Sequence, residues 1–496
     1  MKSPNILILF TDMQRADTIE SWGNPIIKTP NLNNLVKEGT SFLKCYTPSP
    51  VCVSARCSLH YGLYPSKTGC YDNGPMKTDE EDSYVQQLNK AGYYTHSIGK
   101  CHFTPNPYEL RGFHTREIQE EISKDPKRDD YLSDLFKFGY SHITDPHGVR
   151  GEMYYIPQVS QMPAELHPTN WVGEKSTEFI KRMEMKNNSW LLFSSFIHPH
   201  PPFALPAPWH KIYRSPDMPL PNVPQNNDTL LTSINKRQNR YKYRDQGLDN
   251  NLIKLIKAYY YGCISYVDFQ IGKIIKTLKT TNQLENTVII FTSDHGEHLG
   301  DYNSFGKRSM HSTSSRIPLI VSFPGVFPKN VKITNPTSLI DIAKTCLALG
   351  GIKGYDNLYE GENLLEIAKG NSERKYVFSQ WNKEKHAQYM CVSKSGLYFY
   401  SAEDDKEFYF NHLVDPNETE NRAYLIGENQ RVIKGMRDQL LNHLKKNNES
   451  SAFEEEEGKL LWKKHNCRPV YEDPQEGLIY QDHPWATTTL PFDKFQ

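Results

Sequence analysis

The sequence predicts an α/β protein, with a large, mixed, mostly parallel sheet sandwiched by helices and a smaller C-terminal subdomain made of an antiparallel sheet and a helix. Up to about residue 370, short apolar runs bounded by turn residues alternate with stretches of helical periodicity, as for strands buried on both faces. Later runs are shorter and alternate in polarity, which is typical of antiparallel strands. The length of 496 residues exceeds the roughly 250 to 300 at which one core stops growing, so we expect two lobes.

The first lobe, residues 1–370, is expected to begin with a buried strand at residues 5–10, and a helix is expected to start near Cys52. The later elements are a helix at 170–183, a strand at 190–196, a helix at 252–278, and strands at 287–291 and within 318–325. Asp12 follows the first strand and Asp294 follows the strand at 287–291. Ligands gather at the carboxyl ends of strands in open α/β sheets, so we expect these two acids to face one another.

The second lobe, residues 371–450, is expected to contain four short strands and a closing helix. The strands fall at 376–378, 389–392, 396–400 and 408–411, and the amphipathic helix falls at 429–446. Residues 451–496 are expected to form a C-terminal extension. Its four glutamates at 454–457 predict a solvated acidic turn, and the remainder is expected to pack on the first lobe.

The charge balance excludes several classes of partner. Lys and Arg together number 58, as do Asp and Glu, so the formal net charge is zero. A chain without excess positive charge is not built to hold nucleic acid or an anionic membrane surface. Every apolar run stays well below the roughly 18 residues of a membrane-spanning helix. We therefore expect neither nucleic acid nor a membrane as a partner.

The nine cysteines are scattered and odd in number, and they form no CxxC pair, which argues against a disulfide framework. A reducing compartment is the simplest interpretation. The first apolar run breaks at Thr11, too early for a secretory signal. We therefore expect a cytoplasmic location if Met1 is the native start, and a periplasmic one if a signal peptide has been removed.

The segment around Cys52 carries the strongest chemical signal. Cys52 lies at the start of the expected helix and four residues before Arg56, where helix amide groups and a guanidinium lower the pKa of a thiol and hold an anion. The pattern indicates a reactive cysteine at a site that binds an oxyanion. A core cysteine at the start of a helix is the structural alternative.

This segment resembles the signature of the type I sulfatase family, the formylglycine-dependent branch of the alkaline phosphatase superfamily. Cys52-Val-Ser-Ala-Arg56 matches its core, and Ser54 stands where Pro or Ala is commoner. The resemblance covers most of residues 4–423. Its other motifs follow in the expected order: Tyr61-Gly62, Tyr64-Pro65, Gly99-Lys100 with His102, Pro199-His200, Ser293-Asp294-His295-Gly296, Gly306-Lys307, Arg316-Ile-Pro318 and Asp415-Pro416, after Thr11-Asp12 near the start.

The resemblance implies hydrolysis of sulfate esters, of carbohydrates or aryl alcohols, to an alcohol and inorganic sulfate. It also implies that a formylglycine-generating maturation enzyme oxidises Cys52, and that the hydrate of formylglycine is the nucleophile. The expected partners are this maturation enzyme and a small-molecule or saccharide sulfate ester. Many bacterial relatives act on sulfated sugars, and the Lys-, Asn- and Ile-rich composition looks bacterial, which favours a sugar sulfate.

By resemblance, Asp12, Asp294, His295 and the modified Cys52 hold a divalent metal. Charge supports this assignment, because a hard cation neutralises the negative oxygens that a sulfate ester and a hydrate bring. Calcium is the family's usual ion. Met13 stands where many sulfatases have a second aspartate, so the ligands shift toward mixed oxygen and nitrogen, and magnesium, manganese or zinc become alternatives.

The resemblance also assigns catalytic roles to basic residues. Arg56 would support the nucleophile electrostatically, and Lys100 and Lys307 would hold sulfuryl oxygens. His200, together with Lys307, would bind sulfate and protonate the leaving oxygen. His102 would deprotonate the sulfated hemiacetal, which expels sulfate and restores the aldehyde.

Two other functions are carried forward as alternatives. A phosphonate monoester hydrolase or phosphodiesterase would use the same fold and nucleophile, and the combination of Met13 with Asp294-His295 supports it. An inactive relative that binds sulfated glycans is motivated by Ser54 alone.

Two regions bear on substrate choice. Residues 134–171 form a long insert, whose His147, Arg150 and His167 are expected to shape specificity. His311 stands where many relatives have a tyrosine. It either contacts substrate or packs within its loop.

Overall fold

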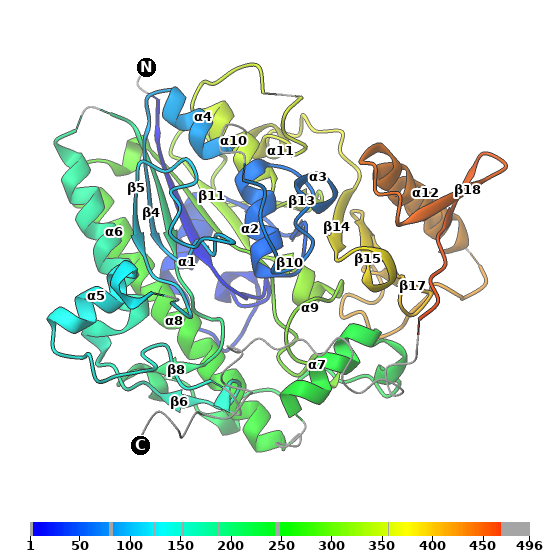
Figure 1. Cartoon of the computed structure of the whole chain (residues 1–496), viewed down its shortest axis with the longest axis horizontal. Coiled ribbons are helices and arrows are strands. Elements are labelled where there is room, and N and C mark those ends of the chain that lie inside the picture. The colour runs from blue at the N-terminus through cyan, green and yellow to red at the C-terminus, as the bar shows by residue number, and fades with distance from the viewer. Residues whose placement is uncertain are drawn as a thin grey trace.

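The computed structural model describes residues 3–467 apart from 79–82, 124, 151–152, 187, 244–248, 356, 428 and the side chains of 240–243. An eight-stranded sheet with helices on both faces forms its centre (Figure 1). The strands in spatial order are β12 (Val331–Ile333), β2 (Thr40–Phe42), β11 (Leu319–Ser322), β9 (Thr287–Ser293), β1 (Asn5–Thr11), β7 (Trp190–Ser195), β4 (Tyr94–Gly99) and β5 (Thr115–Ile118). β11 runs antiparallel to both neighbours and the other pairings are parallel, which confirms the mixed, mostly parallel sheet.

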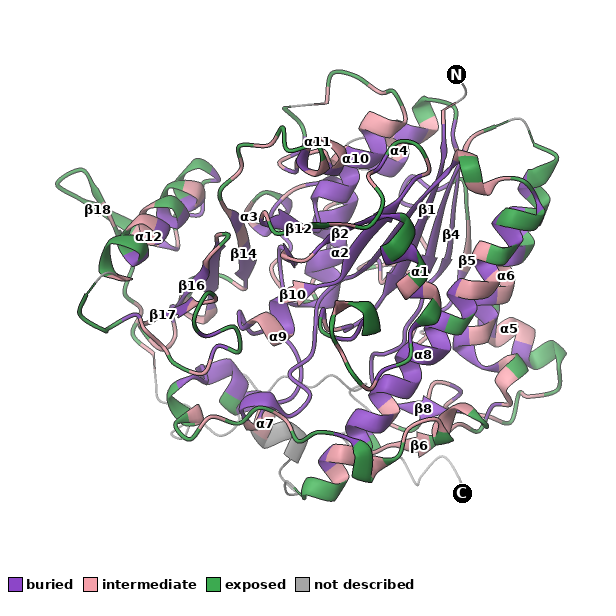
Figure 2. Cartoon of the chain, turned by 180° about the vertical axis from the view of Figure 1, so that it is seen from behind, coloured by how far each residue is buried: buried purple, intermediate pink, exposed green. Residues whose placement is uncertain are grey.

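β1 is buried on both faces because its apolar side chains alternate between two cores. Ile6, Ile8 and Phe10 enter one core, and Leu7 and Leu9 enter the other. The helices that close the first core are α2 (Cys52–Tyr61), α4 (Tyr84–Lys90), α10 (Asp341–Leu349) and α11 (Leu364–Ala368), and those that close the second are α1 (Pro30–Glu38), α5 (Asp130–Lys137), α6 (Pro168–Glu184) and α8 (Asn250–Thr280). Figure 2 shows the buried sheet between helices whose outer surfaces are exposed.

The register of the central strands brings acidic residues together at one edge of the sheet. β1 ends at Thr11, which pairs with Ser293 at the end of β9. Because the two strands are parallel neighbours, Asp12 and Asp294 leave the sheet side by side, as expected from the sequence.

β4 delivers Lys100 to the same edge through a tight turn. Gly99 pairs with Ser195 of β7 and has φ +88°. A Cβ atom at this position would lie 2.0 Å from the carbonyl oxygen of Ser195. Only glycine fits both the left-handed backbone and this close approach, so it sets the direction in which Lys100 leaves the strand.

Helix α2 begins at Cys52, as expected, and all ten of its residues are buried. It ends at Gly62, whose left-handed conformation (φ 63°) is the usual end of a helix. A helix with no exposed face is held by packing on every side, so its first residue is fixed in position.

The C-terminal sheet is a four-stranded antiparallel sheet beside the main one (Figure 1). It consists of β14 (Val377–Trp381), β15 (Gln388–Val392), β16 (Gly396–Ser401) and β17 (Lys406–Asn411), and it is followed by α12 (Asn429–Lys446). Tyr389 and Tyr398 pack with Leu440 of α12, whereas Phe399 and Phe408 pack with residues of the first part of the chain. The smaller antiparallel sheet with its closing helix is thus confirmed, and the division of the chain at residues 370 and 450 stays a prediction.

A hairpin follows α12 where the sequence predicted an acidic turn. It is formed by β18 (Phe453–Glu456) and β19 (Lys459–Trp462), and the glutamates of β18 are exposed. The ring of Trp462 stacks on Tyr400 and Tyr389, with centroids 4.3 and 5.7 Å apart, and its indole nitrogen donates to the hydroxyl of Tyr398 at 3.0 Å. The described part of the extension therefore lies on the C-terminal sheet. Residues 468–496 of the expected extension lie outside the described residues.

Smaller elements complete the described chain. They are β3 (Cys45–Tyr46), β10 (Arg316–Ile317) and β13 (Thr337–Ser338) in one sheet, β6 (Gln158–Val159) with β8 (Ala204–Leu205), and the helices α3 (Pro65–Thr68), α7 (Ser233–Tyr243) and α9 (Ser312–Ser315). Across the described residues, every helix falls short of the combined length and hydropathy that a membrane crossing requires.

Replacing Trp462 with alanine is expected to lower the free energy of unfolding by about 3–5 kcal/mol, because a buried indole ring and its stacking are lost. Chemical denaturation followed by circular dichroism measures the loss. Leu461→Ala on the same strand is the control, since Leu461 is 43% exposed and its loss is expected to cost less than about 0.5 kcal/mol. Equal losses in the two variants would show that Trp462 does not anchor the hairpin.

Candidate functional site

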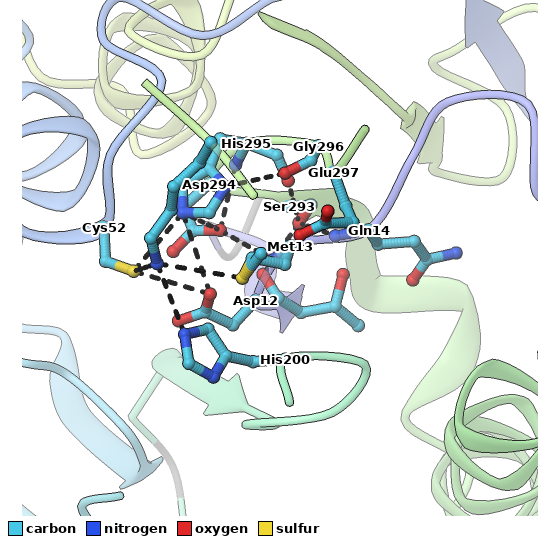
Figure 3. Close-up of polar contacts among 12 residues, drawn as sticks. Asp12, Met13, Gln14, Cys52, His200, Ser293, Asp294, His295, Gly296 and Glu297 are labelled. Atoms are coloured by element: carbon cyan, nitrogen blue, oxygen red, sulfur yellow. Dashed lines mark hydrogen bonds and ion pairs between the residues drawn. The ribbon is translucent and has the colours of Figure 1, made fainter. Parts of the chain in front are cut away.

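Four side chains converge at the carboxyl edge of the central strands (Figure 3). Carboxylate oxygens of Asp12 and Asp294, an imidazole nitrogen of His295 and the sulfur of Cys52 all lie within 4.8 Å of one another, and all four residues are buried. Sγ of Cys52 lies 3.5 Å from Oδ1 of Asp12 and 3.3 Å from Nε2 of His295. These are the four residues that the sequence nominated as metal ligands.

The donor set fits a divalent cation. Nδ1 of His295 lies 2.9 Å from the carbonyl oxygen of Gly296, so it carries the proton and leaves Nε2 with its lone pair toward the other ligands. Burial and the neighbouring Asp12 raise the pKa of Asp294, because two carboxylates in one dry site repel each other. A divalent cation among these atoms would remove that repulsion, and two carboxylates with one imidazole suit such an ion.

Arg56 holds the two acids in place from the side of α2. Its Nη2 lies 3.1 Å from Oδ2 of Asp12, and its Nε lies 3.0 Å from Oδ2 of Asp294. Nη1 donates to the carbonyl oxygen of Lys100 at 2.6 Å and to Oγ of Ser195 at 3.2 Å. Arg56 therefore binds the Oδ2 atom of each carboxylate and ties four strand ends together.

The Cys52 sulfur is held in a positively charged environment. Nζ of Lys307 lies 2.7 Å from Sγ. Burial alone would raise the pKa of the Cys52 thiol, but the ammonium groups of Lys307 and Lys100 outweigh it and lower that pKa well below its usual value. The sulfur occupies the place of the oxygens that formylglycine would carry at this position, so the same cations would face those oxygens.

Lys100 lies between two acids. Its ammonium group contacts Oδ2 of Asp12 at 2.5 Å and also forms an ion pair with Glu121. Burial and Cys52 raise the pKa of Asp12. The positive charges of Lys100, His200 and Arg56 outweigh both effects, so the pKa lies well below its usual range. Asp12 therefore stays ionised, as a metal ligand must.

His200 joins this group as a neutral imidazole. Its Nδ1 lies 2.7 Å from the carbonyl oxygen of Pro201, so Nε2 is the acceptor, 3.3 Å from Nζ of Lys307. Burial and the Lys307 ammonium group lower the pKa of His200 to about 3. The hydroxyl of Tyr154 lies 3.4 Å from the same Nε2 atom.

His102 approaches Cys52 from a left-handed backbone conformation, with φ 55°. Its backbone amide donates to Oε1 of Glu120 at 2.9 Å, which holds this uncommon conformation. A hydrogen bond from its side chain helps to lower the pKa of Cys52. The five basic residues to which the sequence assigned catalytic roles thus each approach Cys52 or a residue that contacts it.

Met13 occupies the position of the second aspartate found in many sulfatases. Its side chain is buried, and its sulfur lies 3.7 Å from Nζ of Lys307. Its backbone amide donates to Oδ1 of Asp294 at 3.1 Å. The chain therefore offers two carboxylates rather than three, with His295 as the nitrogen ligand.

Sequence reasoning missed Glu121 and Tyr154. Glu121 follows β5, and no strand was expected there because Thr-Arg-Glu-Ile has only one apolar residue. Recognising that strand would have drawn attention to an acid just beyond its carboxyl end. Arg150 and Tyr154 of the insert both reach the site, whereas His167 caps α6 through its Nδ1.

Two other residues singled out in the sequence, His311 and Ser54, are engaged in contacts within the fold. His311 is buried, with Nε2 2.9 Å from the carbonyl oxygen of Leu230 and Nδ1 3.5 Å from Glu418. Of its two interpretations, the packed loop residue is the one that these contacts favour. The hydroxyl of Ser54 donates to the carbonyl oxygen of Cys70 at 2.5 Å, so it is engaged within the fold beside α2.

Comparisons with known proteins agree with the site. The sulfatase family model matches residues 4–352, and the model of the C-terminal region of N-sulphoglucosamine sulphohydrolase matches residues 300–447. An arylsulfatase of Clostridium perfringens is 29% identical over 443 residues, which cover 84% of this chain and 90% of that protein. An ulvan-active sulfatase of Formosa agariphila is 28% identical over 371 residues, which cover 74% of this chain and 65% of that protein.

The fold is also similar to that of solved structures. The crystal structure of a phosphonate monoester hydrolase of Agrobacterium radiobacter has a TM-score of 0.77 and 22% identity, and the match covers 93% of this chain and 100% of that one. The family model spans more than half of the sequence, and its members are built around a divalent metal and formylglycine. The chain therefore belongs to the sulfatase family, as its motifs predicted.

Proposed function

We propose that the protein hydrolyses sulfate esters to an alcohol and inorganic sulfate, with residue 52 acting as the nucleophile in its formylglycine form. One observation carries this proposal: Cys52 shares one buried group with Asp12, Asp294 and His295, and its sulfur lies 2.7 Å from Lys307. A nucleophile beside a cation site and a buried ammonium group is what attack on an anionic ester requires.

Asp12, Asp294, His295 and residue 52 are the residues that we assign to the metal. A divalent cation bound there supplies positive charge that lowers the pKa of a coordinated hydroxyl group and neutralises sulfuryl oxygens. We propose calcium, because two buried carboxylates are hard oxygen ligands. The nitrogen ligand His295 makes magnesium, manganese or zinc the alternatives to be tested.

Two cationic groups are assigned to the sulfate, and a third supports them. Lys100 and Lys307 hold sulfuryl oxygens, because both are buried at the site. Lys307 contacts residue 52, and Lys100 contacts Asp12. Arg56 acts one step away, by keeping the two carboxylates oriented. Buried ammonium groups act strongly on the charge that develops in a transition state, because little water screens them.

Lys307 is the group that we assign as proton donor to the leaving oxygen, with His200 as its partner. At neutral pH the low pKa of His200 keeps its imidazole neutral, so Nε2 accepts a hydrogen bond from Lys307 at 3.3 Å. This contact orients the ammonium group, and His200 can take part in returning the proton. His102, whose side chain reaches residue 52, is assigned as the base for the step that releases sulfate.

The maturation enzyme is expected to act before the chain folds. Cys52 is 1% exposed, and every residue of α2 is buried. A second enzyme cannot reach a thiol at the start of such a helix without unfolding it. This argument supports a formylglycine-generating enzyme as the partner of the newly made chain.

A sulfated carbohydrate is the substrate class that we propose, with aryl sulfates as accepted analogues. The ulvan-active and aryl-acting relatives support this range. The second candidate is hydrolysis of phosphonate monoesters or phosphodiesters. One observation favours it: the ligand set includes His295 and, with Met13 in place of an aspartate, has one carboxylate fewer than many sulfatases have.

Cys52→Ala is expected to lower the rate of sulfate release by about 10⁴-fold or more, because the nucleophile is removed. Ion chromatography of sulfate measures it, and mass spectrometry of the tryptic peptide is expected to find formylglycine at residue 52 of the unaltered chain. Cys57→Ala, one and a half turns along the same helix, is the control and is expected to retain most activity. A Cys52→Ala protein within tenfold of the unaltered chain would contradict the assignment.

Chelation of divalent metals is expected to abolish sulfate release, and calcium is expected to restore it better than magnesium, manganese or zinc. Elemental analysis of the active protein should find close to one divalent ion per chain. Reloading should also raise the unfolding temperature, since an ion at about 1,000 times its Kd adds about 4 kcal/mol. Asp294→Asn is the matched variant and should bind the ion more weakly. Full activity without any stoichiometric divalent ion would refute the metal assignment.

Sulfated saccharides and aryl sulfates are expected to be turned over with kcat/KM at least about tenfold above matched phosphonate monoesters and phosphodiesters. The factor corresponds to about 1.4 kcal/mol of differential transition-state binding. One preparation of known formylglycine content should be used for the whole panel. The reverse order of rates would establish the second candidate function instead.

A further inference from the structure

Glu121 is a partly buried acid at the site to which the proposed mechanism gives no role. It lies on the loop after β5, and its side chain is 11% exposed. One carboxylate oxygen pairs with the ammonium group of Lys100, and the other lies 2.9 Å from Nη2 of Arg150. The second oxygen also lies 3.6 Å from Nδ1 of His200. Glu121 thus touches two residues assigned to the sulfate and one residue of the insert.

Lys100 is fully buried, and it is shared between Glu121 and Asp12. Without Glu121, the ammonium group would keep Asp12 as its single anionic partner among these contacts. Its position would then be set by Oδ2 of Asp12 alone, an atom that Arg56 already binds. Glu121 prevents this, because it shares the ammonium group with Asp12 and so holds Lys100 between two carboxylates.

The Glu121 loop is fixed by its neighbours in sequence. The backbone amide of Glu120 donates to Asp129 at 3.0 Å, and the side chain of Gln119 donates to the carbonyl oxygen of Pro168 at 3.1 Å. These contacts anchor the loop to the starts of α5 and α6. A carboxylate on a fixed loop can hold a flexible lysine side chain in one place, which a mobile one cannot.

Arg150 fixes Glu121 from the opposite side. Its guanidinium is 10% exposed, and it also lies over the ring of Tyr154, 5.3 Å from the centroid. Tyr154 in turn contacts Nε2 of His200. The insert therefore reaches both nitrogens of the His200 imidazole. Tyr154 contacts Nε2 directly, and Arg150 acts at Nδ1 through Glu121.

We propose that Glu121, anchored by Arg150 of the insert, is a positioning residue that holds the Lys100 ammonium group where a sulfuryl oxygen binds. The inference rests on the proposed function of the site. Glu121 acts through Lys100 and makes no contact with the reacting atoms itself. The insert at residues 134–171 then contributes to the chemistry through this carboxylate.

Glu121→Gln is expected to lower kcat by about 10- to 100-fold, since a small displacement of a group that binds the transition state costs this much. KM is expected to change by less than about threefold, because Lys307 still binds the ester. Glu121→Asp keeps the negative charge on a shorter side chain, so its kcat should lie between those of the unaltered chain and Glu121→Gln. A merely structural role would instead lower the unfolding temperature and leave kcat per folded chain unchanged.

A double-mutant cycle tests the link to the insert. Arg150→Gln alone is expected to lower kcat by at least about threefold, and the double variant Glu121→Gln/Arg150→Gln should be no slower than Glu121→Gln alone. Additive losses would overturn the claim that Arg150 acts through Glu121. If Glu121→Gln does not fold, an unchanged kcat of Arg150→Gln and Glu121→Asp overturns the proposal, and lowered values support it.

Glu407→Gln is the matched control. Glu407 is 15% exposed, and both of its carboxylate oxygens are also bound by cationic nitrogens, here those of Arg437; it lies on β17 of the C-terminal sheet. Its kcat is expected to stay within twofold of the unaltered chain. An unaltered chain that carries formylglycine but releases no sulfate overturns the proposed function and this inference together. An active unaltered chain with a Glu121→Gln variant of equal kcat overturns this inference alone.

Discussion

The site depends on keeping two carboxylates, Asp12 and Asp294, side by side in a place that water does not reach. Two parallel strands bring them together, and the strands are held by burial of apolar side chains on both faces. Arg56 then bonds to both acids at once, so their repulsion is balanced by one fixed guanidinium and not by solvent. The position of every other polar group follows from this arrangement.

Opposite charges alternate outward from that pair. Lys100 meets Asp12, Glu121 meets Lys100, and Arg150 meets Glu121. Lys307 stands apart from this series, since its partners are the Cys52 sulfur and the neutral His200. Among the described residues, no carboxylate forms an ion pair with Lys307, which lies directly at the nucleophile. Such an arrangement favours an incoming anion without exposing a large positive surface, in keeping with the zero net charge of the whole chain.

Sequence reasoning located the elements whose signal is local. The apolar run at β1, the start of α2 at Cys52 and the amphipathic α12 all carry their periodicity or capping pattern within a few residues. The four metal-site candidates were found because each lies next to such an element or within a motif of the family. The structure brings these four residues together, as the sequence predicted, and their role as metal ligands stays a prediction.

Features that depend on distant partners could not be predicted. β11 runs antiparallel to β9, although nothing in its apolar run sets its direction. β5 is an edge strand with one buried residue, so it lacks the pattern of a central strand, and Glu121 was missed with it. The hairpin β18–β19 is stabilised by stacking of Trp462 on the C-terminal sheet, not by its own exposed glutamates. In each case the stabilising contacts come from residues far along the chain.

The inner face of the C-terminal sheet has a consequence for how the protein can be divided or recombined. Val51, immediately before Cys52, and Met310, three residues after Lys307, belong to the same apolar cluster as Phe399 and Phe408. The residues that flank the nucleophile and Lys307 thus pack against the C-terminal sheet, to which no catalytic residue is assigned. Exchanging that region between relatives would therefore place a different set of side chains against the residues that flank the nucleophile and Lys307.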